Sequence, residues 1–181
     1  MNPIYWDLGD GIEIRTFTPD DASESFALVE ANRDRLHPWM IWEPDTQTAD
    51  DTRAFIVRSL ASETDVEANG IWVDGRLAGT VGLRVDIGDV AAEIGYWIGG
   101  EFEGRGIVTR ACRRFFDFAF DELGMHRMEL CAATENGRSR AVAQRLGMRQ
   151  EGVLRDGVRT PEGHKDLVIY GILEDEWRAQ R

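Results

Sequence analysis

One stretch of the sequence constrains the fold more than any other, because it joins a strand pattern to a helix pattern through glycine. The run AAEIGYWIGG (91–100) is rich in β-forming residues, and the next run, EFEGRGIVTRAC (101–112), places two glycines around Arg105. From Ile107 the apolar side chains keep helical spacing until Gly124, a typical helix end. The stretch therefore predicts a strand, a glycine turn and a helix in direct succession.

The rest of the chain alternates between strand and helix signals. Helical spacing predicts helices over 20–36, 48–63 and 137–147, the second of them capped by Thr48. Alternating or continuous apolar runs predict strands over 11–19, 70–75, 76–86, 126–136 and 165–173, with a hairpin turn at Asp74-Gly75. This order favours an α+β fold, in which a mainly antiparallel sheet is flanked by helices. At 181 residues and 43% hydrophobic content, we expect one domain over residues 1–181.

Charge is distributed unevenly along the chain. The net charge of −12 argues against a nucleic-acid partner, which normally requires a basic surface. Residues 1–100 hold 19 acidic and 7 basic side chains, whereas residues 105–149 hold 9 arginines and 5 acids. The sequence thus offers an anion-tolerant segment beside an acidic one, although the acidity also fits a simple role in solubility.

Several other classes of protein are disfavoured. No apolar stretch approaches the roughly 20 residues of a membrane span, and no signal peptide is visible, so we expect a cytoplasmic protein with no membrane partner. Cys112 and Cys131 lack metal-site spacing and fit packing roles. His37, His126 and His164 are far apart in sequence, so we expect no metal site.

The glycine turn at 104–106 is suited to an anion. A strand, a glycine turn and a helix together present free backbone N–H groups and the positive end of a helix dipole. Gly104 and Gly106 would let a phosphate approach the backbone. The turn is neither a dinucleotide fingerprint, which needs glycine where Thr109 stands, nor a P-loop. A purely structural turn remains an alternative at this point.

A second motif, ENGRSRAVAQRLGM (135–148), accompanies the turn. The ensemble EIGYWIGGEFEGRGIVTRAC with RMELCAATENGRSRAVAQRLGMRQEGVLRD resembles the GNAT superfamily of acyl-CoA-dependent N-acetyltransferases, and within it the Rim-type branch that acetylates ribosomal-protein N-termini. The resemblance covers roughly residues 10–178. It implies an α/β/α layered fold with a mixed, mostly antiparallel sheet of about seven strands and about four helices, in which two strands splay apart to hold acetyl-CoA.

The resemblance also implies a set of cofactor contacts. The backbone of the splayed strand, at Tyr96, Trp97 and Ile98, would bind the pantetheine arm, and an N–H near Ile98 would stabilise the reaction's oxyanion. The candidate contacts for the cofactor's phosphates are Arg105, Arg110, Arg138 and Arg140. For each of these arginines, the simpler alternative is a solvent-exposed charge on a helix surface. The pyrophosphate would lie on the backbone of Glu103, Gly104, Arg105, Gly106, Ile107, Val108 and Thr109.

Catalytic roles follow by the same resemblance. Many family members place a tyrosine where this chain has Ala143, a clear departure, whereas the Rim-like branch has a serine where this chain has Ser139. We therefore expect Ser139 to protonate the leaving thiolate while Asn136 holds the pantetheine; the alternative for Ser139 is a helix-start residue that satisfies backbone N–H groups. Glu93 is the first candidate base, with Glu43, Glu135, Asp166 or a water chain as alternatives.

The identity of the amine acceptor has few signals in the sequence. Trp39, Trp42 and Glu43 lie where Rim-like relatives build an acceptor cleft, and Asp166 is a candidate cleft carboxylate. The leading interpretation is transfer of acetyl to a cationic amine acceptor, a protein N-terminus. A small-molecule amine, such as an antibiotic or polyamine, and a non-catalytic acyl-CoA-binding module remain as alternatives. A homodimer is left open, because the sequence does not determine the oligomeric state.

Overall fold

A single eight-stranded sheet forms the centre of the computed structural model, which describes residues 3–181. The strand order is β1-β2-β3-β4-β5-β6-β8-β7, and every neighbouring pair is antiparallel except β5 and β6. The strands are β1 (Tyr5–Asp7), β2 (Ile12–Thr16), β3 (Asn69–Val73), β4 (Arg76–Asp86), β5 (Ala91–Ile98), β6 (Arg127–Ala133), β7 (Arg149–Thr160) and β8 (Gly163–Leu173). The mixed, mostly antiparallel sheet is confirmed, with eight strands in place of about seven.

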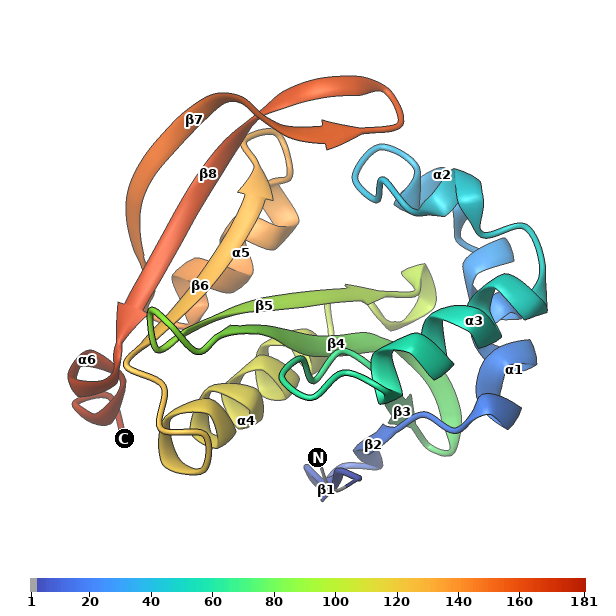
Figure 1. Ribbon diagram of the computed structural model, residues 1–181, viewed down its shortest axis with the longest axis horizontal. Coiled ribbons are helices and arrows are strands. Elements are labelled where there is room, and N and C mark those ends of the chain that lie inside the picture. Colours follow the sequence, from blue (N-terminus) through green and yellow to red (C-terminus); the bar gives the residue numbers. More distant parts are fainter. Residues whose placement is uncertain (1–2) are drawn as a thin grey trace.

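Helices cover both faces of this sheet (Figure 1). The α-helices are α1 (Ala22–Glu30), α2 (Arg33–Leu36), α3 (Ala49–Leu60), α4 (Ile107–Asp121), α5 (Gly137–Arg145) and α6 (Glu174–Arg178). On one face α4 packs fully buried side chains such as Phe115 and Phe116 into the main core. On the other face Ile56 of α3 packs with Phe17 and Trp72 in a second cluster. The layered arrangement is confirmed, with six α-helices in the described residues in place of about four.

The helix predicted over 20–36 is two helices. Asn32 leaves the helical conformation, with φ −128° and ψ 14°, and separates α1 from α2. Its side-chain amide donates to the Leu28 carbonyl at 2.8 Å and its side-chain oxygen accepts from the Gly100 N–H at 2.8 Å. The break therefore ties the end of α1 to the segment that follows β5.

Two local predictions are confirmed in detail. Thr48 caps α3 by accepting from the Asp51 N–H at 3.2 Å, while the Asp51 carboxylate accepts from the Thr48 N–H at 2.8 Å. The β3–β4 hairpin turns at Asp74 and Gly75 with φ of 51° and 76°, the left-handed pair that a two-residue hairpin favours.

The longest strand, β7, carried no usable sequence signal. It lies at the edge of the sheet, most of its residues are exposed, and its pairing with β8 is interrupted at two places. Side chains on such a strand need not alternate between apolar and polar, so the usual pattern is missing. The short β1 and α6 were not predicted either.

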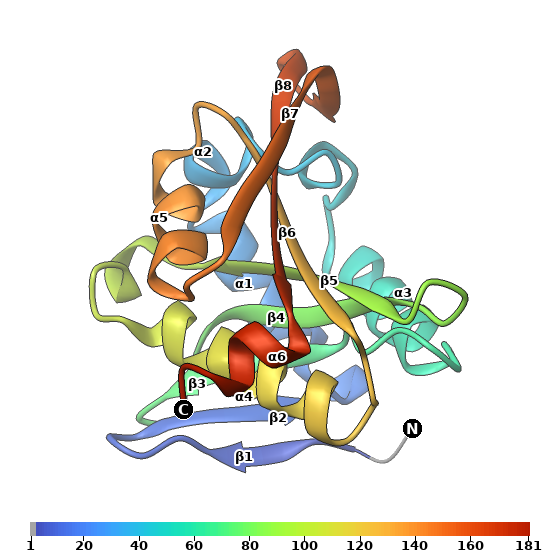
Figure 2. The same ribbon diagram turned by 90° about the vertical axis from the view of Figure 1, so that its left-hand side faces the viewer.

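The parallel pair at the centre of the sheet is the feature that creates a site. Pairing between β5 and β6 is limited to Ala91–Glu93 against Arg127–Glu129. Beyond these residues the two strands diverge, and β6, β8 and β7 run steeply across the direction of β4 and β5 (Figure 2). The sheet is therefore split between β5 and β6.

Candidate active site

The β5 backbone lines the split in the sheet. The Gly99 N–H donates to the Ala78 carbonyl at 2.7 Å, so Trp97 and Gly95, in alternation with Gly99, also turn their backbone groups toward β4. Ile94, Tyr96 and Ile98 then turn theirs toward the split. The structure thus gives Tyr96 and Ile98 the orientation expected for a bound pantetheine arm, but it turns the Trp97 backbone the other way.

The glycine turn lies at the start of α4, as the sequence predicts. Gly104 and Gly106 have φ of 73° and 74°, a conformation that L-residues other than glycine rarely adopt, and a Cβ on either would meet nothing within 4 Å. In the part of the chain that the structure describes, the N–H groups from Gly104 to Thr109 have no protein acceptor. An open cradle of N–H groups at a helix N-terminus fits a pyrophosphate.

The four candidate arginines differ in what they contact. Arg110 donates to the Asp10 carboxylate at 2.8 Å and to the Leu8 carbonyl, so it anchors the β1–β2 turn. Arg140 donates to the Tyr170 hydroxyl at 3.2 Å and to the Thr134 carbonyl at 3.0 Å. These two are engaged in holding elements together.

Arg105 and Arg138 remain beside the glycine turn. Arg138 is 76% exposed and pairs with Glu103 at 3.0 Å, while the Arg105 guanidinium lies 5.9 Å from the centre of the Phe102 ring. Arg35 also pairs with Glu103. The cations next to the turn are thus supplied by α2, the turn itself and α5.

A hydroxyl pair joins the β5 side of the split to α5. The Tyr96 phenol oxygen lies 2.9 Å from Ser139 Oγ. Asn136 caps α5, because its side-chain oxygen accepts from the Ser139 N–H at 3.1 Å. The capping role considered for Ser139 therefore belongs to Asn136, and the Ser139 hydroxyl is turned toward Tyr96.

Glu93 lies on the opposite face of β5 from Tyr96, the face of Trp97, whose ring packs with Val29 and Leu36. It is 37% exposed and stands 3.9 Å from the Arg84 guanidinium. Burial raises the pKa of Glu93, the Arg84 charge opposes that rise, and the nearby Glu129 adds to it. A carboxylate with a raised pKa is better suited to accept a proton near neutral pH.

Glu43, a candidate for both base and acceptor contact, is buried and fully engaged. Its carboxylate accepts from Arg33 at 2.5 Å and pairs with His37 Nδ1 at 2.7 Å. Burial alone would raise the pKa of Glu43, but the hydrogen bonds from His37 and Arg33 outweigh it and lower the pKa. The structure therefore assigns Glu43 to holding the 33–46 segment together.

The β7–β8 hairpin reaches across the split toward the loop after α2 (Figure 1). At this junction Lys165 Nζ lies 4.8 Å from the centre of the Trp39 ring, and it also pairs with Glu162 at 2.9 Å and Glu135 at 3.4 Å. Trp42 lies deeper, with its ring centre 6.2 Å from that of Trp97. Of the two candidate acceptor tryptophans, Trp39 thus contacts the hairpin, whereas Trp42 packs against β5.

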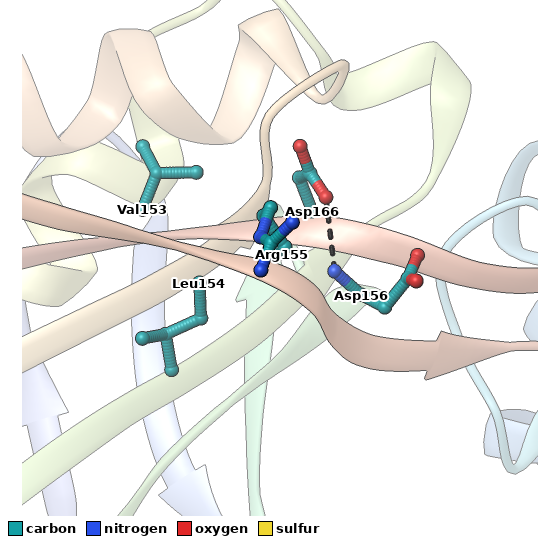
Figure 3. A pocket seen from close by; sticks show the side chains of 5 residues that line it. All are labelled: Val153, Leu154, Arg155, Asp156 and Asp166. Atoms are coloured by element: carbon teal, nitrogen blue, oxygen red, sulfur yellow. Dashed lines mark hydrogen bonds between the residues drawn. The ribbon is translucent and has the colours of Figure 1, made fainter.

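Asp166 lies at an irregularity of the hairpin rather than free in the split. Its carboxylate accepts from the Asp156 N–H at 2.9 Å (Figure 3). The two aspartates line a pocket with Val153, Leu154 and Arg155, where the β7 register shifts between Leu154 and Val158. The Asp166–Asp156 contact could not be predicted, because β7 itself had no sequence signal.

Among residues 3–181, no group of three or more histidine, cysteine or acidic side chains is placed to hold a metal ion. Cys112 is fully buried in the core and Cys131 is half-buried on β6; neither is in a disulfide. No helix of the described chain is long and apolar enough to cross a membrane.

The chain is similar to known acetyltransferases along nearly all of its length. The family model "Acetyltransferase (GNAT) domain" matches residues 12–149. YdaF of Bacillus subtilis (strain 168), a candidate ribosomal N-acetyltransferase, is 40% identical over 179 residues, which cover 96% of this chain and 97% of YdaF.

Solved structures agree with that similarity. A crystal structure described as a "probable acetyltransferase" is 39% identical, covers 96% of this chain and 99% of its own, and superposes with a TM-score of 0.87. RimL, a ribosomal L7/L12 α-N-protein acetyltransferase solved with coenzyme A, shares the fold at a TM-score of 0.88 and 19% identity, over 94% of this chain and 98% of RimL. The chain therefore belongs to the acetyltransferase (GNAT) family and is an acyltransferase.

Proposed function

We propose that this acyltransferase moves the acetyl group of acetyl-CoA directly to the α-amine of a protein N-terminus. The donor site has two parts that match two adjoining segments of coenzyme A, its pyrophosphate and its pantetheine arm. The open N–H cradle from Gly104 to Thr109 suits the pyrophosphate, and the β5 backbone at Tyr96 and Ile98 suits the amide groups of the pantetheine arm. A coenzyme A complex of the same fold, RimL, supports this assignment.

The chemistry then requires three tasks from the protein. A neutral amine attacks the thioester carbonyl, a backbone N–H such as that of Ile98 stabilises the oxyanion, and a donor protonates the departing sulfur. One oxyanion donor typically contributes about 3 kcal/mol. Ser139, at the start of α5 beside the split, is the proposed proton donor. Glu93, directly or through water, takes the proton that the amine gives up.

The proposal that the acceptor is an α-amine rests on the contacts of the candidate general bases. Glu43 is held by Arg33 and His37, Glu135 by Lys165, and Asp166 by the Asp156 N–H, which leaves Glu93 as the candidate with a raised pKa. A lysine amine has a pKa of about 10.4 and an α-amine about 7.7–8.0, so deprotonating lysine costs roughly 3.5 kcal/mol more. A single, partly paired carboxylate such as Glu93 is therefore better suited to deprotonate an α-amine than a lysine amine.

A screen of acceptors with mass detection of products tests this proposal. Each peptide is offered with a free α-amine and, separately, with the α-amine blocked and an internal lysine left free. We expect acetylation of the first form and none of the second. Acetylation of polyamines or antibiotics in preference to every free N-terminus would assign the enzyme to small amines instead.

A further inference from the structure

The Tyr96 side chain has no role in the scheme above, which uses only the Tyr96 backbone. Yet its phenol oxygen lies 2.9 Å from Ser139 Oγ and 3.4 Å from the Ser139 carbonyl oxygen. The two residues come from β5 and α5, 43 positions apart in sequence, and both are partly buried. This side-chain hydrogen bond therefore fixes α5 against the diverging strand at the split.

The residues around Ser139 make Tyr96 the hydrogen-bond partner of its hydroxyl. Capping of α5 is done by Asn136, so the Ser139 hydroxyl is not needed for it. Ala143, one turn further along α5, is fully buried and carries no group that could exchange a proton. Within the described residues, Tyr96 is the side chain that hydrogen-bonds Ser139 Oγ.

We propose that Tyr96 is a positioning residue for catalysis: its phenol holds Ser139 Oγ so that the Ser139 hydrogen is directed into the split, toward the thioester sulfur. The inference rests on the proposed function, in which Ser139 protonates that sulfur. A serine hydroxyl has one hydrogen and two lone pairs. When Tyr96 donates to one lone pair, the hydrogen of Ser139 is free to point elsewhere.

The proton balance of the step is closed. The amine nitrogen bonds to the acetyl carbon, the carbon–sulfur bond breaks with its electron pair on sulfur, and Ser139 passes its proton to sulfur. The nitrogen releases one proton to Glu93, directly or through water, Glu93 then gives that proton up to the solvent, and the solvent returns one proton to Ser139 Oγ. The net products are an amide and a thiol, and both side chains regain their starting states. While Oγ is short of its proton, the hydrogen bond from Tyr96 is charge-assisted and stronger. Burial raises the pKa of Tyr96, which keeps the phenol protonated as a donor.

A double-mutant cycle on turnover tests the coupling, using whichever amine the wild-type enzyme acetylates. We expect Ser139→Ala to lower kcat about 100-fold and Tyr96→Phe about tenfold, each with little change in KM for acetyl-CoA. Because Tyr96 acts through Ser139, the double variant should be no slower than Ser139→Ala. Wild-type kcat in Tyr96→Phe, or losses that multiply in the double variant, would overturn the assignment.

The same cycle is run on the unfolding free energy of the ligand-free protein, where acetyl-CoA plays no part. Both substitutions remove the hydrogen bond between Tyr96 and Ser139 Oγ, so we expect their combined effect to be less than additive; fully additive effects would overturn the contact itself. Tyr170→Phe is the matched control, since Tyr170 is a buried tyrosine whose hydroxyl contacts Arg140 instead. It should add independently to Ser139→Ala. If wild-type protein acetylates no amine, the proposed function fails, while the unfolding cycle still reports on Tyr96.

Discussion

At the scale of single residues, Glu93 shows how position in the sheet changes the chemistry of a carboxylate. It stands at the last paired position between β5 and β6, opposite Arg84 on one side and Glu129 on the other. Burial raises its pKa more than the Arg84 charge lowers it. The folded protein therefore binds a proton at Glu93 more tightly than the unfolded chain does.

This shift predicts a pH dependence of stability with a definite sign. At pH values between the unfolded and the folded pKa of Glu93, the native state holds more protons, so stability falls as pH rises through that window. Glu93→Gln should remove this loss, and the variant should gain stability relative to wild type as pH rises through that window. Urea unfolding of both proteins at a series of pH values measures the difference. Parallel curves over the whole range would show that Glu93 has an ordinary pKa.

Residue roles were only partly predictable from sequence. The positions of Asn136 and Ser139 at a helix start followed from spacing, but which of the two caps the helix depends on side-chain direction. The sequence shows that Glu43 is a carboxylate close to two tryptophans. Its burial against Arg33 and His37 could not be predicted, because it depends on how the 33–46 segment folds. The Tyr96–Ser139 contact spans 43 positions, and no local pattern encodes a contact at that distance.

At the scale of elements, the turn between β5 and α4 combines two glycine conformations with unpaired N–H groups. Gly106 is the N-cap of α4 and makes no side-chain cap, so the first turn of the helix is open to a ligand. A side chain at this position would be strained by φ and would stand in the space that the phosphates are proposed to occupy.

Gly106→Ala should weaken coenzyme A binding at least tenfold, or about 1.4 kcal/mol, because both the backbone angle and the open cradle are lost. Gly124→Ala is a matched control: Gly124 has φ of 67°, its Cβ would also meet nothing within 4 Å, and it lies beyond the other end of α4. The two variants should lose similar stability, and only the first should lose affinity in calorimetric titration. Equal affinity in both folded variants would rule the turn out as the phosphate site.

Elements with strong local signals were predicted well. The amphipathic α4, the capped α3 and the Asp74-Gly75 hairpin each carry their own pattern, because one buried face or one turn type dictates the residues. The break at Asn32 and the exposed edge strand β7 were missed. The break at Asn32 depends on a hydrogen bond with Gly100, which is distant in sequence. Strand β7 forms by pairing with β8 and has no buried face that would give its sequence an alternating pattern.

At the scale of the whole molecule, the two parts of the chain that precede and follow Gly100 differ in net charge. The acidic first hundred residues supply β1 to β5 and the helices α1 to α3, whereas the later part, net neutral, supplies α4, α5 and the β7–β8 hairpin. Exposed carboxylates lie beside the candidate acceptor residues, including Asp34 and Asp45, which flank Trp39 in sequence, and Glu162 on the hairpin. The chain's single lysine, Lys165, is already paired there with Glu162 and Glu135.

This distribution predicts that a basic acceptor is attracted through exposed charges and the donor is held mainly by directed hydrogen bonds. Attraction between exposed charges is screened over about 8 Å at physiological ionic strength and about 3 Å at 1 M salt. Raising salt should therefore increase the KM of a basic peptide acceptor, with a much smaller change in the KM of acetyl-CoA.

A neutral peptide with a free α-amine serves as the control, because its KM should respond little and should start higher at low salt. Initial rates over a salt series for the three substrates measure this. If basic and neutral peptides react with equal KM at every salt concentration, the acidic surface serves solubility alone, and the preference for a cationic acceptor has no electrostatic basis.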